Sequence, residues 1–302
     1  MKRILSLLLA LCLALACSGC GLRSPEERQL MRSQLDYAKE APSIDSFNYA
    51  LNDGSRLEPF QLYTADQVTV TLLGVHETPD DYRVALRLEN NSQDWYSFHC
   101  GSCTIDRWSV MGSLYEQVCP GGVVDADVVL YKSDYPQAAG PVCRMDLELS
   151  CATTGDDGYH EFEASLELRD PAQAQEPELL PLLEDPGYLI SLLDTRETDY
   201  GLVIDLAVEN TGDRYLSLYA DESSPVINGQ QTYLTLWSSV WLDPGSRSVM
   251  SLEMDWMELA ELDIHGLKEL ESFSLELSLD RSGVSEHITL ELDKEELAPP
   301  AL

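Results

Sequence analysis

Two similar stretches constrain the fold of this chain more than any other feature. Residues 81–92 read DYRVALRLENNS, and residues 199–212 read DYGLVIDLAVENTG. In both, apolar side chains alternate with polar ones, which is typical of a β-strand in a sheet that is buried on one side only. Each stretch ends in a Glu-Asn segment whose residues tolerate a tight turn. The pattern predicts two equivalent, half-buried strands.

Further landmarks follow these stretches in the same order. Asn90 and Asn210 lie 120 positions apart, and a Pro-Gly turn comes later in each half, at residues 120–121 and 244–245. Two β-rich segments then close each half. Landmarks that recur in one order are best explained by an internal repeat. We therefore expect two copies of one β-unit.

Each half reads as about seven or eight short strands separated by turn signals, without the strand–helix alternation of parallel sheets. This predicts an all-β fold with two tandem antiparallel β-sandwiches, at residues 61–170 and 187–295. Residues 171–186 are rich in proline and acid, which favours an extended, semi-stiff linker. Residues 256–270 suggest a short helix that only the second half has. Residues 296–302 form a C-terminal tail.

The N-terminus resembles a secretion signal. Lys2 and Arg3 precede an apolar run over residues 4–16. A bilayer span needs about 20 apolar residues, so this run is better suited to a signal peptide. One interpretation is an ordinary signal cut near Ala16, which would release the protein.

The residues after this run favour a second interpretation. Ser18-Gly19-Cys20 resembles the lipobox of bacterial lipoproteins, in which a cysteine after small residues is lipidated and becomes the mature N-terminus. The resemblance implies a signal peptide at residues 1–19 and a lipid on Cys20, with Cys17 as the competing site. It also implies an extracytoplasmic body anchored to the cell membrane through that lipid.

Residues 20–60 are expected to connect the anchor to the first sandwich. Ser24-Pro25-Glu26-Glu27 has the features of a helix start: a capping side chain, proline at the first position and acids in the first turn. A short helix is predicted from there to Glu40. The following stretch has no clear periodicity and is expected to be a spacer, with docking onto the body as the alternative.

The tandem plan resembles the immunoglobulin-like modules of Gram-positive cell-surface lipoproteins. The resemblance covers about residues 61–295 and rests on the Glu-Asn turns, on Ile227-Asn228-Gly229 and on the Pro-Gly turns. It implies a non-enzymatic binding, adhesion or assembly role, with a cell-wall, glycan or protein partner. It supplies no catalytic residue and no cofactor.

Charge narrows the range of partners. The chain has 53 acidic and 19 basic residues, a net charge of −34. Such a field repels nucleic acid, so no nucleic-acid partner is expected. The chain also lacks a calcium-loop motif, a His-Glu-x-x-His motif and a Gly-x-Ser-x-Gly motif. We therefore predict neither a catalytic residue nor a bound metal.

Five cysteines lie beyond the signal region, all in the first unit: Cys100, Cys103, Cys119, Cys143 and Cys151. Disulfides are chemically allowed outside the cytoplasm, so all five are disulfide candidates. The preferred pairing sets Cys143 or Cys151 against the Cys100–Cys103 loop, although sequence does not fix connectivity. The alternative function is an extracytoplasmic redox or zinc protein that uses the Cys-x-x-Cys loop.

Aromatic residues provide the clearest indication of a binding face. Large aromatic side chains usually pack in cores, but adjacent Trp95 and Tyr96 cannot both point inward from one strand. An exposed aromatic on a sandwich face suits a sugar or a peptide. The candidates for such a face are Trp95, Tyr96, Tyr215, Trp237 and Trp241. A third hypothesis makes the chain a subunit of a surface assembly that pairs through edge strands.

Overall fold

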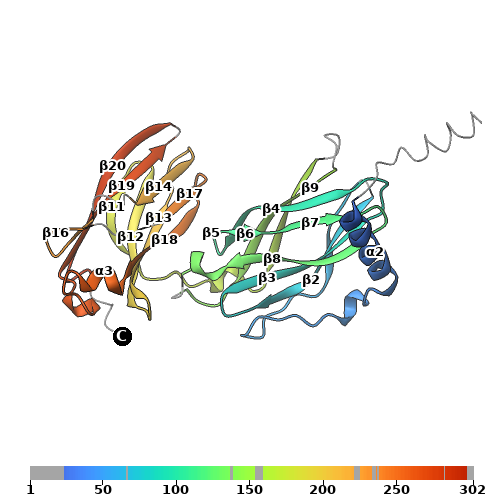
Figure 1. The fold of residues 1–302 in the computed structure, drawn as a ribbon, viewed down its shortest axis with the longest axis horizontal. Helices are drawn as coiled ribbons and strands as arrows, with labels where there is room; N and C mark the ends of the chain where they lie inside the picture. Colours follow the sequence, from blue (N-terminus) through green and yellow to red (C-terminus); the bar gives the residue numbers. More distant parts are fainter. Residues whose placement is uncertain are drawn as a thin grey trace, which may run out of the picture.

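A computed structural model describes residues 24–65, 67–136, 139–153, 159–220, 225–232, 236, 238–281 and 283–297. Two β-lobes follow one another along the chain (Figure 1). The predicted signal peptide (residues 1–19) and both candidate lipidation sites, Cys17 and Cys20, lie outside the described residues, as does Trp237. Within the described part, no helix is both long and apolar enough to cross a bilayer.

The first lobe packs two antiparallel sheets face to face. One sheet has the strand order β1-β2-β3-β8-β6, and the other has β10-β9-β4-β5 with β7 beside β4. One apolar cluster, with Leu86 from the first sheet and Phe98 from the second, fills the space between them. The strands are β1 (Phe60–Ala65), β2 (Val68–Glu77), β3 (Asp81–Asn90), β4 (Tyr96–Ile105), β5 (Trp108–Val110), β6 (Gly112–Ser113), β7 (Tyr115–Val118), β8 (Val123–Tyr131), β9 (Arg144–Thr153) and β10 (His160–Glu167).

The second lobe is built in the same way. Strands β11-β12-β13-β18 face a sheet with the order β16-β15-β19-β14-β17, in which β20 also pairs with β19. A separate apolar cluster, centred on Leu206 and Leu277, lies between them. The strands are β11 (Leu180–Asp185), β12 (Tyr188–Glu197), β13 (Gly201–Glu209), β14 (Leu216–Ala220), β15 (Val226–Ile227), β16 (Gln230–Gln231), β17 (Ser239–Leu242), β18 (Arg247–Asp255), β19 (Ser272–Arg281) and β20 (Val284–Asp293).

The predicted all-β sandwich class is therefore confirmed. The short helix predicted only in the second half is also present, as α3 (Trp256–Ala260) and the 3-10 turn η4 (Leu267–Glu269). Further 3-10 turns are η1 (Ile44–Ser46), η2 (Lys132–Asp134) and η3 (Pro171–Gln173). One boundary differs from the prediction, because β11 lies inside the predicted linker and pairs with β12 as a sheet edge.

The internal repeat includes register shifts in the strand ladders that the sequence alone does not reveal. The β1–β2 ladder shifts register between Gln61 and Tyr63, and the β11–β12 ladder shifts between Pro181 and Leu183, 120 positions later. A second shift, on β2 between Leu72 and Gly74, recurs at the same offset on β12. Because a bulge bends and twists its strand, both sheets acquire the same local shape.

A buried asparagine at the end of β3 and of β13 holds the following turns in place. The Asn90 side-chain amide donates to the carbonyls of Asp94 (2.7 Å) and Val118 (2.9 Å). Asn210 makes the same pair of bonds, at 2.7 and 2.9 Å, to Arg214 and Leu242. The two side chains are 0% and 1% exposed. A short polar side chain thus replaces the backbone partners that the strand end lacks.

The Pro-Gly turns attach to the same two asparagines. The amide of Gly121 donates to the Asn90 carbonyl at 2.7 Å, and the amide of Gly245 donates to the Asn210 carbonyl at 2.9 Å. Both glycines have positive φ angles, 72° and 75°, a conformation that side chains with a Cβ disfavour. The turn and the asparagine therefore form one unit in each lobe.

The two lobes are joined by a shared sheet. β5 and β18 pair in parallel at Trp108 and Arg247, so the second sheet of the first lobe continues into β18-β13-β12-β11. The Arg247 guanidinium stacks over the buried Trp108 ring at 4.3 Å from its centroid. The Ser248 hydroxyl donates to the Ser109 carbonyl at 3.0 Å. Backbone pairing, stacking and a hydrogen bond fix one lobe against the other.

The prediction that the organising strands are buried on one side only is wrong. On the outer face of β3, Ala85 and Arg87 are only 2% and 4% exposed, and on β13 Val203 and Ala207 are both 5% exposed. The alternation of residue types is real, but both faces are covered. Other parts of the chain, which local periodicity does not reveal, provide the cover.

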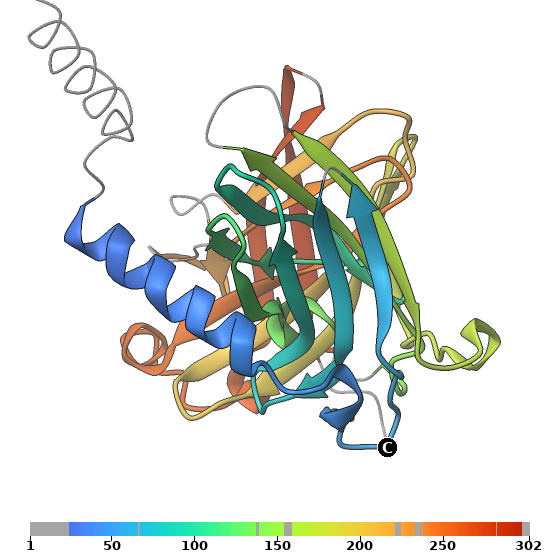
Figure 2. The ribbon, with the colours of Figure 1, turned by 90° about the vertical axis from the view of Figure 1, so that its right-hand side faces the viewer.

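The N-terminal segment covers the outer face in the first lobe. Helix α2 (Pro25–Glu40) begins with the predicted cap, a reciprocal pair of bonds between Ser24 and Glu27. It lies across β7 and β8 (Figure 2), where the buried Gln34 side chain bonds Gln117 and Cys119 backbone groups at 2.6 and 2.8 Å. Residues 24–59 are thus docked rather than extended as a free spacer.

An ion pair anchors this docked segment. Arg87 binds Asp125 on the neighbouring strand through two parallel bonds of 2.7 and 2.9 Å. Its third nitrogen donates to the Pro42 carbonyl at 2.9 Å, and the Phe47 ring covers the guanidinium. The Tyr37 hydroxyl donates to Asp125 and, mainly through burial, the pKa of this phenol is raised. One pair of charges thus contacts both the helix and the spacer, in addition to the Gln34 bonds.

Replacing the buried asparagines should destabilise the lobes. In Asn90→Ala or Asn210→Ala, two buried carbonyls lose their donor, so we expect the free energy of unfolding to fall by about 2 kcal/mol in each case. Urea denaturation would measure the loss. Asn91→Ala, at the exposed neighbouring position, is the matched control and should change stability by less than about 0.5 kcal/mol. Equal effects at residues 90 and 91 would contradict the assigned role.

Neutralising Asp125 should release the N-terminal segment. Asp125→Asn leaves Arg87 largely buried without a counter-charge, a loss of about 3 kcal/mol for such pairs. We expect tryptic cleavage after Lys39 to become at least about tenfold faster in limited proteolysis. Asp45→Asn removes the same charge from an exposed position and should leave the rate unchanged. Unchanged cleavage in Asp125→Asn would show that the ion pair does not hold the segment.

Candidate ligand-binding face

The outer face of the second lobe carries an exposed aromatic group. In the β14–β17 ladder, Ser217 lies opposite Trp241, so Tyr219 projects beside the indole on the same face. The two rings meet edge to face at 5.9 Å, and the Trp241 indole N–H donates to the Tyr219 hydroxyl at 3.0 Å. Trp241 is 50% exposed and Tyr219 is 39% exposed. The rings fix each other while their faces remain open to solvent.

Polar side chains border this aromatic group. Ser278 lies opposite Tyr219 on β19, and His287 lies opposite Ser278 on β20. The His287 Nδ1 is 3.3 Å from the Ser278 hydroxyl and 3.0 Å from a Glu276 carboxylate oxygen. Tyr215, 44% exposed, lies on the same face two residues before Ser217. The face therefore combines flat apolar rings with hydrogen-bond donors and acceptors.

The first lobe has a smaller version of the same face. His99 lies at the position equivalent to Tyr219, opposite Ser150 on β9 and Tyr115 on β7. The His99 and Tyr115 rings are 5.1 Å apart at 63°, and Tyr115 is 63% exposed. His99 thus occupies the position of Tyr219, but its ring partner differs in register, because Tyr115 corresponds to Ser239 and Gln117 to Trp241.

The predicted binding residues fall into three groups. Tyr215 and Trp241 are exposed on one face, as expected for a ligand surface. Trp95 is half-buried, whereas Tyr96 is 4% exposed and packs in the core, so Tyr96 is withdrawn as a candidate. Alternation in β4 explains the difference, because neighbouring side chains point to opposite faces. Tyr219 is an aromatic residue of the same half that is not among these five candidates, and the pairing of Ser217 with Trp241 places it beside the indole.

The favoured pairing of Cys143 or Cys151 with the Cys100–Cys103 loop stays a prediction. Cys100, Cys103 and Cys143 carry no disulfide in this structure. Cys143 lies at the start of β9, with its sulfur 3.4 Å from the Pro141 carbonyl, and Cys151 lies opposite Phe98. The sulfurs of Cys100 and Cys103 are 3.1 Å apart. The loop cysteines therefore face each other.

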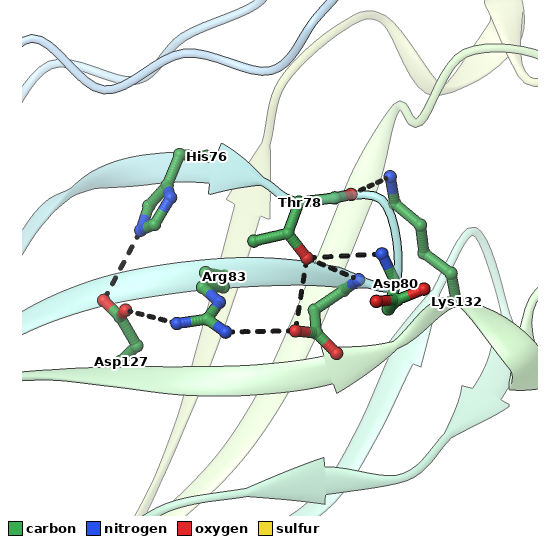
Figure 3. Close-up of polar contacts among 7 residues, drawn as sticks. His76, Thr78, Asp80, Arg83, Asp127 and Lys132 are labelled. Atoms are coloured by element: carbon green, nitrogen blue, oxygen red, sulfur yellow. Dashed lines mark hydrogen bonds and ion pairs between the residues drawn. The ribbon is translucent and has the colours of Figure 1, made fainter.

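A polar network surrounds the β2–β3 hairpin of the first lobe and joins it to η2 (Figure 3). Its members lie on β2, β3, β8 and the adjoining turns: His76, Thr78, Asp80, Asp81, Arg83, Asp127 and Lys132. Arg83 bridges Asp81 (3.1 Å) and Asp127 (3.5 Å), while the Thr78 hydroxyl accepts from the amide of Asp81 at 3.0 Å. The Tyr49 ring stacks on His76 at 4.7 Å. These contacts fasten the hairpin and the docked segment, which is a structural role.

The described residues contain no group of three or more His, Cys, Asp or Glu side chains placed to hold a metal ion. The acidic side chains mostly lie along outer strand faces, as on β10, where Glu161, Glu163 and Glu167 alternate with inward-facing residues. Glu161 contacts Glu148, and this neighbour raises the pKa of the Glu161 carboxyl. These acids form charged surface ladders rather than one converging site.

No family model matches this chain, and no curated protein matches it. Among solved structures, the YadV chaperone aligns with 70% of this chain and 92% of its own at 12% identity and a TM-score of 0.22. Red sea bream transglutaminase aligns with 75% of this chain and 31% of its own at 9% identity and a TM-score of 0.24. A protein of unknown function from Porphyromonas gingivalis W83 aligns with 71% of this chain and 92% of its own at 13% identity and a TM-score of 0.20. TM-scores this low carry no argument about fold or function.

Proposed function

We propose that this chain is a lipid-anchored, extracytoplasmic, non-enzymatic module that binds a glycan at the cell surface. The observation that supports the ligand class is the exposed Tyr219–Trp241 pair, fixed edge to face on the outer sheet of the second lobe. Rings held open to solvent offer flat apolar surfaces for the C–H faces of sugars. Neighbouring Ser278 and His287 offer partners for sugar hydroxyls.

Charge restricts the kind of glycan. A net charge of −34 repels phosphate- or uronate-rich polymers at moderate salt. A neutral polymer, or one that contains amino sugars, would meet no such repulsion. The proposed ligand is therefore a neutral or amino-sugar-containing chain rather than an anionic one.

The proposed location rests on the sequence. The apolar run over residues 4–16 and the Ser18-Gly19-Cys20 segment support export and lipidation of Cys20, with Cys17 as the alternative. The docked helix α2 begins at Pro25, close after these cysteines. An anchor at Cys20 would therefore hold the first lobe near the membrane, because residues 24–59 lie along that lobe instead of extending from it.

Removing the exposed indole should weaken glycan binding. We expect Trp241→Ala to raise the dissociation constant of the full chain for an insoluble polysaccharide (chitin or purified peptidoglycan) about tenfold, equivalent to about 1.4 kcal/mol. Less of the variant should therefore be retained on the polymer. Tyr219→Ala should act in the same direction, because it removes one ring and the hydrogen bond that orients the other. Co-sedimentation at several polymer concentrations would measure both.

Tyr200→Ala provides the matched control. Tyr200 is 84% exposed at the β12–β13 turn, away from the β14–β17 face, so its loss should not alter retention. Equal losses in Trp241→Ala and Tyr200→Ala would exclude the aromatic face as the binding surface. Retention that is unchanged in Trp241→Ala but lost at 0.5 M salt (a chosen condition, roughly a 4 Å Debye length) would indicate a basic partner instead.

A further inference from the structure

A bulge in β4 brings Cys100 and Cys103 to one side of the strand. Cys100 lies opposite Leu149 and Cys103 lies opposite Leu147, so β4 carries one more residue than β9 over this stretch. In a regular strand, residues three apart would point to opposite faces. The additional residue reverses the second side chain, and both sulfurs turn toward the interior of the first lobe. Their 3.1 Å separation follows from this bulge.

A glycine on the facing strand makes room for the two sulfurs. A Cβ on Gly112 in β6 would lie 2.6 Å from the Cys103 sulfur and 2.8 Å from the Cys100 sulfur. Both distances are shorter than side-chain carbons tolerate, so only glycine fits here without a shift of β6 or of the thiols. β6 pairs with β8 in the other sheet, so the space for the pair is built by both sheets.

The two thiols are not equivalent. Cys103 is 1% exposed and belongs to the core cluster, whereas Cys100 is partly exposed, next to the exposed bulge residues Gly101 and Ser102. A hydrogen bond from the Cys103 thiol lowers the pKa of Cys100, and the same bond, together with burial, raises the pKa of Cys103. The accessible sulfur is thus the better nucleophile of the two, and the buried one lies within reach of it.

We propose that Cys100 and Cys103 form a reversible dithiol–disulfide site that exchanges with a low-molecular-weight or protein disulfide. The Cys100 thiolate attacks one sulfur of that disulfide, forms a mixed disulfide and releases the first thiol. Deprotonated Cys103 then attacks the Cys100 sulfur, closes the Cys100–Cys103 bond and releases the second thiol. The pair loses two electrons and two protons, and the exogenous disulfide gains them.

Two features favour exchange over a static staple. A bridge between residues three apart closes a very short loop, which restricts the unfolded chain little compared with a long loop. The second lobe has Ala220 at the position equivalent to Cys100 and folds on the same plan, so the pair is dispensable for the fold. This proposal is independent of the glycan proposal, which concerns the other lobe.

The experiment equilibrates the full chain with mixtures of reduced and oxidised dithiothreitol, quenches with acid, and alkylates under denaturing conditions. Intact mass and peptide mapping then report the alkylated cysteines. We expect two alkylations to disappear together as the mixture becomes oxidising, both at Cys100 and Cys103, and to return on reduction. Cys143→Ser should show the same transition, and Cys100→Ser should abolish it.

Gly112→Ala tests the contribution of β6. The added methyl group competes for the space of both sulfurs, so the oxidised fraction at a fixed dithiothreitol ratio should differ from the wild type. The mapping of the wild-type chain decides the proposal even if variants fold poorly. Alkylation of Cys100 and Cys103 at every ratio would overturn it. So would a bridge from Cys100 to Cys119, Cys143 or Cys151, or stoichiometric zinc bound by the reduced pair.

Discussion

Each lobe depends on one buried asparagine. Asn90 and Asn210 lie at the end of the central strand. Their backbone carbonyls accept a hydrogen bond from the glycine amide of the Pro-Gly turn, and their side-chain amides donate to carbonyls on two further segments. Loss of one of these partners would lower the stability of the lobe by about 1–3 kcal/mol. Few other residues could make the same hydrogen bonds in this geometry. Apart from the Ser92 hydroxyl, which donates to the Asn90 Oδ1, the partners are backbone groups, so most of the surrounding side chains are free to differ. This explains how two copies of low sequence similarity keep one architecture.

The two copies differ most on the outer face of the central strand. The first lobe places Arg87 against Asp125 there, and the second lobe has Ala207 against Val249 at the same register. The charged pair binds the N-terminal segment, while the apolar pair joins the core cluster of the first lobe. A charged residue in a lobe–lobe contact would need its own counter-charge, so apolar residues suit the permanent contact. The outer face of the central strand thus contacts the N-terminal segment in the first lobe and the neighbouring lobe in the second.

Local sequence pattern was sufficient for features that depend on local chemistry. It predicted the strands β3 and β13, the helix start at Ser24 and the repeat offset, because alternation, capping and turn residues act over a few positions. It did not predict the burial of Arg87 or the strand β11 within the proline-rich linker, since both depend on pairing with distant residues. The candidate site was predicted in part for the same reason. Trp241 was a candidate from the sequence, whereas its contact with Tyr219 depends on the register between β14 and β17.

The bulge in β4 shows how one added residue changes chemistry without changing fold. In a regular strand Cys100 and Cys103, three residues apart, would point to opposite faces, and neither sulfur could reach the other. The added residue leaves the β4–β9 ladder in register on both sides, and His99 keeps its place opposite Ser150, as Tyr219 does opposite Ser278. The outer aromatic face and the inner thiol pair are therefore separable properties of the same strand. A duplicated sheet can then carry an inward-facing thiol pair in one copy and an exposed aromatic pair on the outer face of the other.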